Sequence, residues 1–325
     1  MLFKNCRSKL KYAEAVLSYF QVEIIMGKLE CNGLTKVYED HRKALENVTF
    51  TVDTNGIFGL IGRNGAGKTT LIRILATELQ PTAGSASING FDVLTQEGKL
   101  REKIAIVPQE ARTIRWMTAK QTVFSYLLWR GYRYNDAKRL ADESLAKLGL
   151  EQYANVLTSK LSGGTKRKVL LATVTASEAD VIFLDEPTTG LDPISRRELW
   201  EILRALGKER FIFLTTHYLE EAEQLADKIG ILKDGKLVSF GTLPELRKTV
   251  RYQYSIKLPP KVQVPQLKDG EVTTDKSGVA QIMTNEDEAF SLAKAFAEQA
   301  VKFSIAPVTL DDIFFYLVGQ KARDE

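Results

Sequence analysis

Short apolar runs alternate with amphipathic segments along most of the chain. Runs of four or five residues dominated by apolar side chains are too short for buried helices and are typical of strands covered on both faces of a parallel sheet. The segments after several of them, including 194–207 and 218–226, have helical periodicity. This alternation predicts an α/β domain that binds its ligand at the carboxyl ends of the strands. The runs lie at residues 57–61, 104–107, 181–184, 211–215 and 229–232.

Three other segments have a different texture. Residues 28–60 alternate in the manner of exposed strands, whereas 118–150 has the periodicity of two or three helices. From about residue 246 proline and glycine turns separate short strand-like stretches, and helices are predicted at 286–299 and 309–318. We therefore expect a main domain over residues 26–245, with a helical insert at about 110–160, and a small α+β accessory domain over 246–325.

Residues 1–25 allow two interpretations. Lys4, Arg7, Lys9 and Lys11 fit a basic amphipathic helix that lies on a membrane or a partner. Alternatively the segment is an upstream extension outside the working protein, with Met26 as the true start, and this interpretation is favoured. No continuous apolar core indicates a signal peptide.

Composition narrows the classes of protein. The chain has 325 residues, of which 44% are apolar and 26% charged, as in an ordinary globular protein. No apolar run is long enough for a membrane span, so any membrane role is expected to be peripheral. A net charge of +4 is too small to indicate nucleic-acid binding, and none is expected. Cys6 and Cys31 have no metal or redox spacing and fit reduced thiols in a cytosolic protein.

The segment 62–70 has the pattern of a phosphate-binding loop between a strand and a helix. Its glycines let the backbone turn tightly and direct N–H groups at phosphate oxygens. Lys68 is expected to reach the β- and γ-phosphates, and the Thr69 hydroxyl is expected to ligate Mg²⁺. The helix that follows presents its positive end to the same anion. The predicted nucleotide-binding residues of this loop are Gly62, Asn64, Gly65, Gly67, Lys68, Thr69 and Thr70.

Two further segments extend this chemistry. Asp185 and Glu186 follow the apolar run 181–184. The Asp185 carboxylate would hold Mg²⁺ through water, and the Glu186 carboxylate would orient the attacking water. Ser162, Gly163 and Gly164 open a second helix, predicted over 166–175, with another set of N–H groups for an anion. Two phosphate-binding helix starts in one chain suggest that two copies sandwich two nucleotides.

The run Leu161-Ser162-Gly163-Gly164-Thr165 resembles the signature motif of the ABC ATPases, with Thr165 in place of the usual glutamine. Matching motifs occur in the family's order at Tyr38, Gln109, Asp192 and His217. The resemblance covers about residues 28–245. It implies a P-loop NTPase core of ABC type with an antiparallel β subdomain and an α-helical insert.

The resemblance also implies roles for these residues. Tyr38 would stack on adenine, and Asp192 would act across the dimer interface. Gln109 would contact Mg²⁺ and the water, and His217 would contact the γ-phosphate; with Glu186 they form the expected catalytic set. The expected cofactors are ATP and Mg²⁺. The expected ligands of the ion are Thr69, Gln109 and Asp185.

The accessory domain and its acidic-aromatic end at 310–317 resemble the type-2 export branch of ABC transporters. This implies an ATP-hydrolysing subunit on the cytoplasmic face of the cell membrane. It would work as a homodimer, or as a heterodimer with a paralogous ATPase, and drive a separate integral membrane permease. The alternatives are a soluble ABC ATPase in translation or DNA maintenance and an importer subunit. The chain has one cassette and no heptad run, which disfavours the soluble class.

Within the insert, residues 112–147 carry eight basic side chains against three acidic ones. A solvated helical surface is the default interpretation of such a charge excess. In ABC transporters this region docks a coupling helix of the permease. The aromatic and apolar residues at 124–129 fit either the core of the insert or a docking surface, and the sequence leaves both open.

Overall fold

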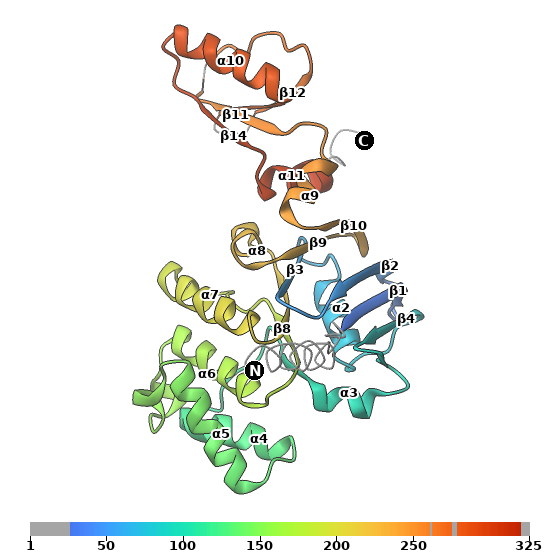
Figure 1. Ribbon diagram of the computed structural model, residues 1–325, viewed down its shortest axis with the longest axis vertical. Helices are drawn as coiled ribbons and strands as arrows, with labels where there is room; N and C mark the ends of the chain where they lie inside the picture. Colours follow the sequence, from blue (N-terminus) through green and yellow to red (C-terminus); the bar gives the residue numbers. More distant parts are fainter. Residues whose placement is uncertain (1–26, 261, 275–277, 320–325) are drawn as a thin grey trace, which may run out of the picture.

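The protein is described by a computed structural model that covers residues 27–260, 262–274 and 278–319. Both interpretations of residues 1–25 fall outside these ranges. Within them, no helix has the length and apolar character needed to cross a membrane. Figure 1 shows the helices of the insert at one end of the long axis, two sheets in the middle and a C-terminal unit at the other end.

A six-stranded sheet forms the centre of the molecule, in the order β10-β9-β3-β8-β7-β6. Neighbouring strands from β9 to β6 run parallel, and β10 pairs antiparallel with β9. The expected parallel sheet is therefore present. The strands are β3 (Ile57–Ile61), β6 (Ile104–Val107), β7 (Val181–Asp185), β8 (Phe211–Thr216), β9 (Lys228–Lys233) and β10 (Lys236–Gly241).

Alternate side chains of the buried strands enter two different cores, because successive residues of a strand point to opposite faces. Phe183 and Phe213 belong to one core, and Leu184 and Leu214 belong to the other. All four side chains are completely buried. Continuous apolar runs are thus needed here because both faces of the sheet are covered.

The first face is covered by helix α2 (Lys68–Leu75) and, beyond it, by a four-stranded antiparallel sheet in the order β2-β1-β4-β5. Helix α3 (Glu97–Lys103) leads from this sheet into β6. Figure 1 shows α2 between the two sheets. The strands of the antiparallel sheet are β1 (Lys28–Val37), β2 (Lys43–Asp53), β4 (Ala83–Ile88) and β5 (Phe91–Asp92).

The second face is covered by helices that share one core with the insert. Two helices follow the signature segment and the acidic pair, α6 (Gly163–Ala176) and α7 (Pro193–Gly207). The insert contributes α4 (Ala119–Trp129), α5 (Tyr134–Lys147) and the short 3₁₀ turns Glu151–Tyr153 and Thr158–Lys160. Helix α6 begins three residues earlier than predicted, because the Ser162 hydroxyl caps it by accepting from the Thr165 N–H.

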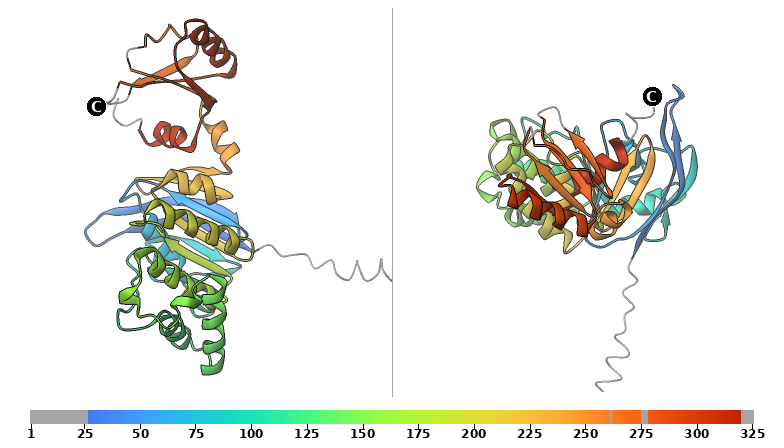
Figure 2. Two further views of the ribbon diagram at one scale, coloured as in Figure 1. Left: turned by 90° about the vertical axis from the view of Figure 1, so that its left-hand side faces the viewer. Right: turned by 90° about the horizontal axis from the view of Figure 1, so that it is seen from above.

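The C-terminal unit is built on a third sheet, which is antiparallel with the order β12-β13-β11-β14. Its strands are β11 (Tyr254–Leu258), β12 (Gly270–Thr274), β13 (Ala280–Thr284) and β14 (Ser304–Pro307), and helix α10 (Glu286–Glu298) packs on them. The last strand lies a little after the predicted 301–305. Figure 2 shows this unit standing apart from the central sheets.

Two helices join the C-terminal unit to the central sheet. Helix α9 (Leu243–Thr249) follows β10 directly, and α11 (Leu310–Gly319) returns to pack beside α9 and α8 (Leu219–Leu225). Ile313 and Val318 of α11 share one apolar core with Ile229 and Ile231 of the central sheet. The last described helix, α11, therefore packs against α8, which begins two residues after His217.

Candidate functional site

The phosphate-binding loop connects β3 to α2, as the sequence predicted. Gly67 has φ 108°, a conformation that side chains other than hydrogen rarely allow, and a Cβ there would lie 2.4 Å from the Ala44 carbonyl oxygen. A Cβ at Gly62 would lie 2.5 Å from the Leu232 carbonyl oxygen. Both positions therefore require glycine, because neighbouring backbone closes over the loop.

The loop holds Lys68 at the start of α2. Its ammonium group is buried and donates to the carbonyl oxygens of Gly62, at 2.8 Å, and Arg63, at 3.3 Å. The first N–H groups of an α-helix have no partner within the helix. A fixed positive charge and free N–H groups thus point into one space, which suits a polyphosphate.

Glu186 is the meeting point of the predicted catalytic residues. Its Oε2 accepts from Nε2 of Gln109 at 3.1 Å and lies 3.0 Å from Nδ1 of His217. Its Oε1 lies 3.4 Å from Nζ of Lys68. Thr189, which the sequence analysis did not select, donates its hydroxyl to Oε2 at 3.0 Å. Three residues far apart in the sequence, Lys68, Gln109 and His217, and the nearby Thr189 therefore hold one carboxylate.

This environment changes the charge behaviour of Glu186. Burial raises the pKa of its carboxyl, but Lys68 and His217 lower it by more, so the net pKa lies below the usual glutamate value. The backbone of Glu186 has φ 48°, which is uncommon for a residue other than glycine. Its N–H donates to both the carbonyl and the hydroxyl of Thr215, which fixes this conformation.

Asp185 lies one residue earlier, at the end of β7, and only 1% of its surface is exposed. The Thr215 hydroxyl donates to its Oδ1. Thr215 therefore holds both members of the acidic pair, Asp185 through its carboxylate and Glu186 through its backbone N–H. A threonine in the strand β8 was not predicted to have this role, because the run 211–215 reads simply as a buried strand.

A cavity of about 330 Å³ opens beside these groups. Tyr38 and Arg42 line it together with the phosphate-binding loop, Gln109 and Glu186. The Arg42 guanidinium lies 4.8 Å from the centre of the Tyr38 ring, and the Tyr38 hydroxyl lies 3.2 Å from Oγ1 of Thr70. The cavity therefore combines an aromatic ring with a cationic loop, the two surfaces that a nucleotide requires.

The signature residues lie elsewhere. Ser162, Gly163 and Gly164 do not line this cavity. Ser162 and Gly163 are exposed at the start of α6. Thr165 takes the position of the usual glutamine, and its Oγ1 lies 2.8 Å from the Ser162 hydroxyl. The signature is therefore free to meet another molecule, with Thr165 fixing the orientation of its serine.

Asp192 is likewise exposed and outside the cavity. It caps helix α7 by accepting from the N–H groups of Ile194 and Ser195, and it also accepts from the Ser195 hydroxyl at 2.7 Å. These hydrogen bonds, chiefly from Ser195, lower the pKa of the Asp192 carboxyl. Within the chain its role is to start a helix.

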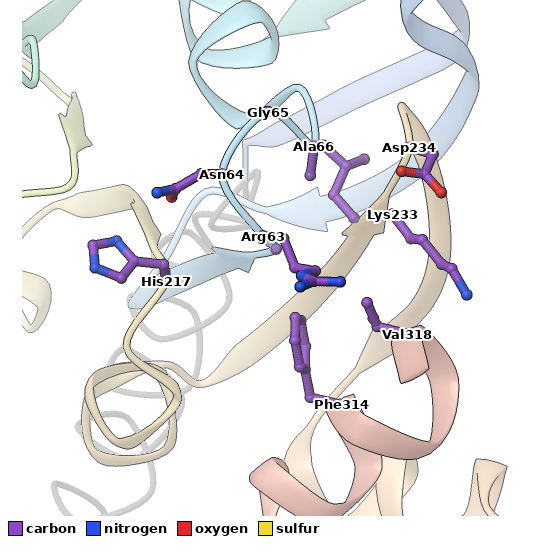
Figure 3. A pocket seen from close by; sticks show the side chains of 11 residues that line it. Arg63, Asn64, Gly65, Ala66, His217, Lys233, Asp234, Phe314 and Val318 are labelled. Atoms are coloured by element: carbon purple, nitrogen blue, oxygen red, sulfur yellow. The ribbon is translucent and has the colours of Figure 1, made fainter. Parts of the chain in front are cut away.

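A second cavity, of about 710 Å³, also borders the phosphate-binding loop. Arg63 and His217 line it together with Phe314 and Val318 of helix α11, as Figure 3 shows. Lys233, at the rim, donates to the carbonyl oxygen of Leu317 at 3.0 Å. The C-terminal helix thus reaches the nucleotide-binding loop, a proximity that the sequence did not indicate.

Comparison with known proteins decides the family. The family model described as ABC transporter matches residues 45–189. Over 306 residues the chain is 35% identical to the daunorubicin resistance ATP-binding protein DrrA3 of Streptomyces coeruleorubidus, which covers 90% of this chain and 96% of the relative. The chain belongs to the family of ABC transporter ATP-binding proteins. It is an ABC ATPase, which binds and hydrolyses ATP.

Two further similarities agree with this assignment. The ABC ATPase is 32% identical over 311 residues to the daunorubicin/doxorubicin resistance ATP-binding protein DrrA of Streptomyces peucetius, covering 91% of this chain and 94% of that one. Its fold resembles a dimeric ATP-binding cassette in a post-hydrolysis state with ADP and phosphate bound, with a TM-score of 0.60 and 27% identity. That match covers 66% of this chain and 98% of the cassette. The predicted fold class is confirmed.

Proposed function

We propose that this ABC ATPase is the nucleotide-hydrolysing subunit of an exporter and drives a separate integral membrane permease from its cytoplasmic face. The observation that supports hydrolysis most directly is the convergence of Lys68, Gln109 and His217 on the Glu186 carboxylate beside the cavity. A carboxylate that is held from several sides and stays ionised is suited to orient and polarise a water molecule.

Each residue of the site has a part in this proposal. Lys68 and the N–H groups of the loop bind the phosphates, and Tyr38 stacks on the base. Glu186 orients the water for attack on the γ-phosphorus, while His217 and Gln109 hold Glu186 and contact the γ-phosphate side. Contact with the phosphates draws Lys68 away from Glu186, which leaves the carboxylate a stronger base.

Mg²⁺ fits the oxygen donors at the site. Thr69 is exposed and lines the cavity, and Asp185, which does not line it, is a buried carboxylate next to the lining residue Glu186. Gln109 uses Nε2 for Glu186, which leaves its Oε1 oxygen available. Hydroxyl, carboxylate and amide oxygens with water are ligands that Mg²⁺ prefers. When bound, the ion would neutralise charge on the phosphates.

The exposed signature supports a homodimer. Ser162 and Gly163 are exposed at the start of α6 and do not line the nucleotide cavity of their own chain, and the Ser162 hydroxyl bonds within its own turn, to Thr165. In a two-fold dimer each signature would close over the partner's phosphate-binding loop, and Asp192 would lie near the same interface. A paralogous ATPase could replace one copy without changing this geometry.

Export is supported by the relatives rather than by the site. Two of them are named for resistance to daunorubicin, and they match nearly the whole chain, including the C-terminal unit. A soluble ABC ATPase in translation or DNA maintenance and an importer subunit are the alternatives. Neither gains support from these relatives.

The dimer can be tested by light scattering on the Glu186→Gln variant. With ATP and Mg²⁺ we expect a mass twice that of the 36.4 kDa chain, and with ADP the mass of one chain. Adding Ser162→Arg should abolish the dimer while nucleotide binding by the single chain persists. If Glu186→Gln stays a single chain with ATP, the proposed sandwich is wrong.

A further inference from the structure

Arg167 lies in the second turn of α6, five residues after Ser162, and its guanidinium contacts three backbone carbonyls. Nε donates to the Pro187 oxygen at 2.7 Å, and Nη2 donates to the Glu186 oxygen at 2.9 Å. Nη1 reaches the Gln109 oxygen at 3.5 Å. One side chain of the signature helix therefore holds the backbone of the proposed base, of its neighbour and of the glutamine that contacts it.

The contact to Glu186 bears on a strained residue. At φ 48° the backbone of Glu186 persists only if its surroundings fix it, since a left-handed conformation is unfavourable for a side chain of this kind. Thr215 fixes the N–H side of the residue, and Arg167 fixes the carbonyl side. Together they determine the direction in which the carboxylate leaves the backbone.

The charge of Arg167 is not used in an ion pair. Across the part of the chain that the structure describes, no carboxylate lies within 4.0 Å of its guanidinium nitrogens. Its donors go to neutral carbonyl oxygens in a fork that a lysine, with one ammonium group, cannot reproduce. The direct contacts of Arg167 are therefore geometric, while the Asp185 carboxylate attracts its guanidinium over a longer distance.

In the proposed sandwich dimer, Arg167 would also connect two nucleotides. The start of its helix would grip the ATP on the partner's loop, whereas Glu186 serves the ATP on its own loop. Ser162 caps the helix that carries Arg167, and hydrogen bonds link successive turns of a helix, so the two residues are expected to move together. We propose that Arg167 is a positioning residue that sets the backbone of Glu186 and links it to the signature helix. This inference rests on the proposed sandwich dimer.

Arg167→Ala, Arg167→Lys and the matched control Arg130→Ala test the proposal. Arg130 also donates to three backbone carbonyls, those of Arg101, Glu102 and Ile104, but it lies away from the site. We expect Arg167→Ala to lower kcat by at least about tenfold, the lower part of the range for a positioned group, with little change in KM. Arg167→Lys should recover only part of the rate. Arg130→Ala should lower the melting temperature comparably and leave kcat near wild type.

A double-mutant cycle separates positioning from general damage to the fold. If Arg167 acts through Glu186, Arg167→Ala should cost little further turnover once Glu186→Gln is present. The Hill coefficient for ATP should also fall toward one in Arg167→Ala, because the two sites lose their connection. The proposal would be overturned if the loss of turnover in the double variant equals the product of the losses in the two single variants. A kcat for Arg167→Ala equal to that of Arg130→Ala would also overturn it. Failure of Glu186→Gln to dimerise with ATP would instead show that the sandwich itself is wrong.

Discussion

Lys68 Nζ lies 3.4 Å from Glu186 Oε1, with both side chains more than nine-tenths buried. The same ammonium group also donates to two carbonyl oxygens of the phosphate-binding loop. It is therefore shared between the loop that receives phosphates and the carboxylate proposed to activate water. Nucleotide phosphates will compete with Glu186 for this charge, so binding and activation of the base are coupled through one side chain.

This competition predicts a difference between two pH profiles. In the free enzyme Lys68 holds the pKa of Glu186 below its usual range, although burial acts in the opposite direction. When the phosphates take Lys68, the pKa of Glu186 should rise. The acid limb of kcat, which reports the ATP complex, should therefore lie at higher pH than that of kcat/KM, which reports the free enzyme. Coincident limbs would show that Lys68 does not control the base.

Glu186→Gln should keep ATP binding and lower turnover by at least about tenfold, because the amide keeps the size of the side chain and one acceptor oxygen but cannot accept the proton. Single-turnover and steady-state hydrolysis measure the loss, and a fluorescent nucleotide measures binding. Glu220→Gln is the matched control, since Glu220 is exposed on α8. Near-normal hydrolysis in Glu186→Gln would assign the base to another residue.

Lys68→Ala should instead lose nucleotide affinity outright, because the phosphate charge is left without its buried counter-charge. Titration calorimetry with ATP measures the affinity. The variant leaves Glu186 without its nearest cation, so the pKa of that carboxyl should rise and its ionised form should lose stability. Retention of wild-type affinity would contradict the role assigned to the loop.

Tyr38 offers a graded test of the adenine end. Tyr38→Phe keeps the ring under Arg42 and removes only the hydroxyl contact with Thr70. Stacking of a base on an aromatic side chain contributes about 1–3 kcal/mol, so Tyr38→Ala should raise the dissociation constant for ATP by roughly fivefold or more, and Tyr38→Phe much less. Equal effects of the two variants would mean that the ring does not stack on the base.

Much of this site could be predicted from the sequence, because its parts are local. The loop at 62–70, the acidic pair and the signature each consist of adjacent residues whose chemistry is evident from their order. The sequence could not show which of these separate segments lie together in the folded protein. Gln109, Thr189 and His217 meet at one oxygen of Glu186 only because β6, β7 and β8 are neighbours in the sheet.

Other contacts were missed because their signal is weak in a single sequence. Arg167 reads as one member of a basic run at 166–168, yet its fork to three carbonyls is visible only in three dimensions. Helix α11 was expected to belong to the accessory domain, but its apolar face packs against α8 and the central sheet. The docking of a C-terminal helix on a distant loop leaves no periodic pattern to read.

Glu221 gives a prediction about stability. Its side chain is completely buried, and Oε1 accepts from the indole N–H of Trp200 at 3.1 Å. Burial raises the pKa of this carboxyl above the usual glutamate value, although its hydrogen bonds act in the opposite direction. The folded protein therefore holds this proton more tightly than the unfolded chain does. Its contribution to the free energy of unfolding is complete below the unfolded pKa, about 4.3, and is lost as pH rises through the folded pKa.

Glu221→Gln should flatten this dependence, because the amide keeps an acceptor for Trp200 and carries no charge at any pH. Urea unfolding at several pH values above the unfolded pKa measures it. The control Glu220→Gln, which changes an exposed neighbour, should follow the wild-type curve. Parallel curves for wild type and Glu221→Gln would show that this carboxyl does not control the stability in that range.

The helical insert combines exposed aromatic residues with unpaired positive charge. Phe124 and Leu127 pack in the core, whereas Leu128 and Trp129 are exposed, so the segment 124–129 is divided between the two roles that the sequence left open. Trp116 is 78% exposed and precedes α4. Several basic residues of the insert are tied to carboxylates or carbonyls, as Lys120 is to Asp142.

Arg112 and Arg115 are exposed and, within the described ranges, form no ion pair. They follow Gln109, which contacts Glu186, and come shortly before the exposed Trp116 in the sequence. We therefore expect the exposed side chains near residues 110–130 to dock the permease and report the state of the nucleotide site to it. Arg130 is not one of them, because its guanidinium is bonded to backbone carbonyls of the chain. An apolar side chain at the centre with unpaired cations beside it is the composition of an interface rather than of a solvated helix.

Reversing both charges, Arg112→Glu with Arg115→Glu, should weaken co-purification with the permease while ATP hydrolysis by the isolated subunit stays intact. Association should also become less sensitive to salt in this variant, because exposed charge pairs are screened by ions. Lys138→Glu, an exposed charge reversal on α5 of the same insert, is the matched control and should leave association unchanged. Equal losses in both variants would show a general effect of charge. The soluble alternative would be correct if the protein never associates with membranes and its ATP hydrolysis responds to ribosomes or DNA. The surface near residues 110–130 would then report the state of the nucleotide site to a different partner.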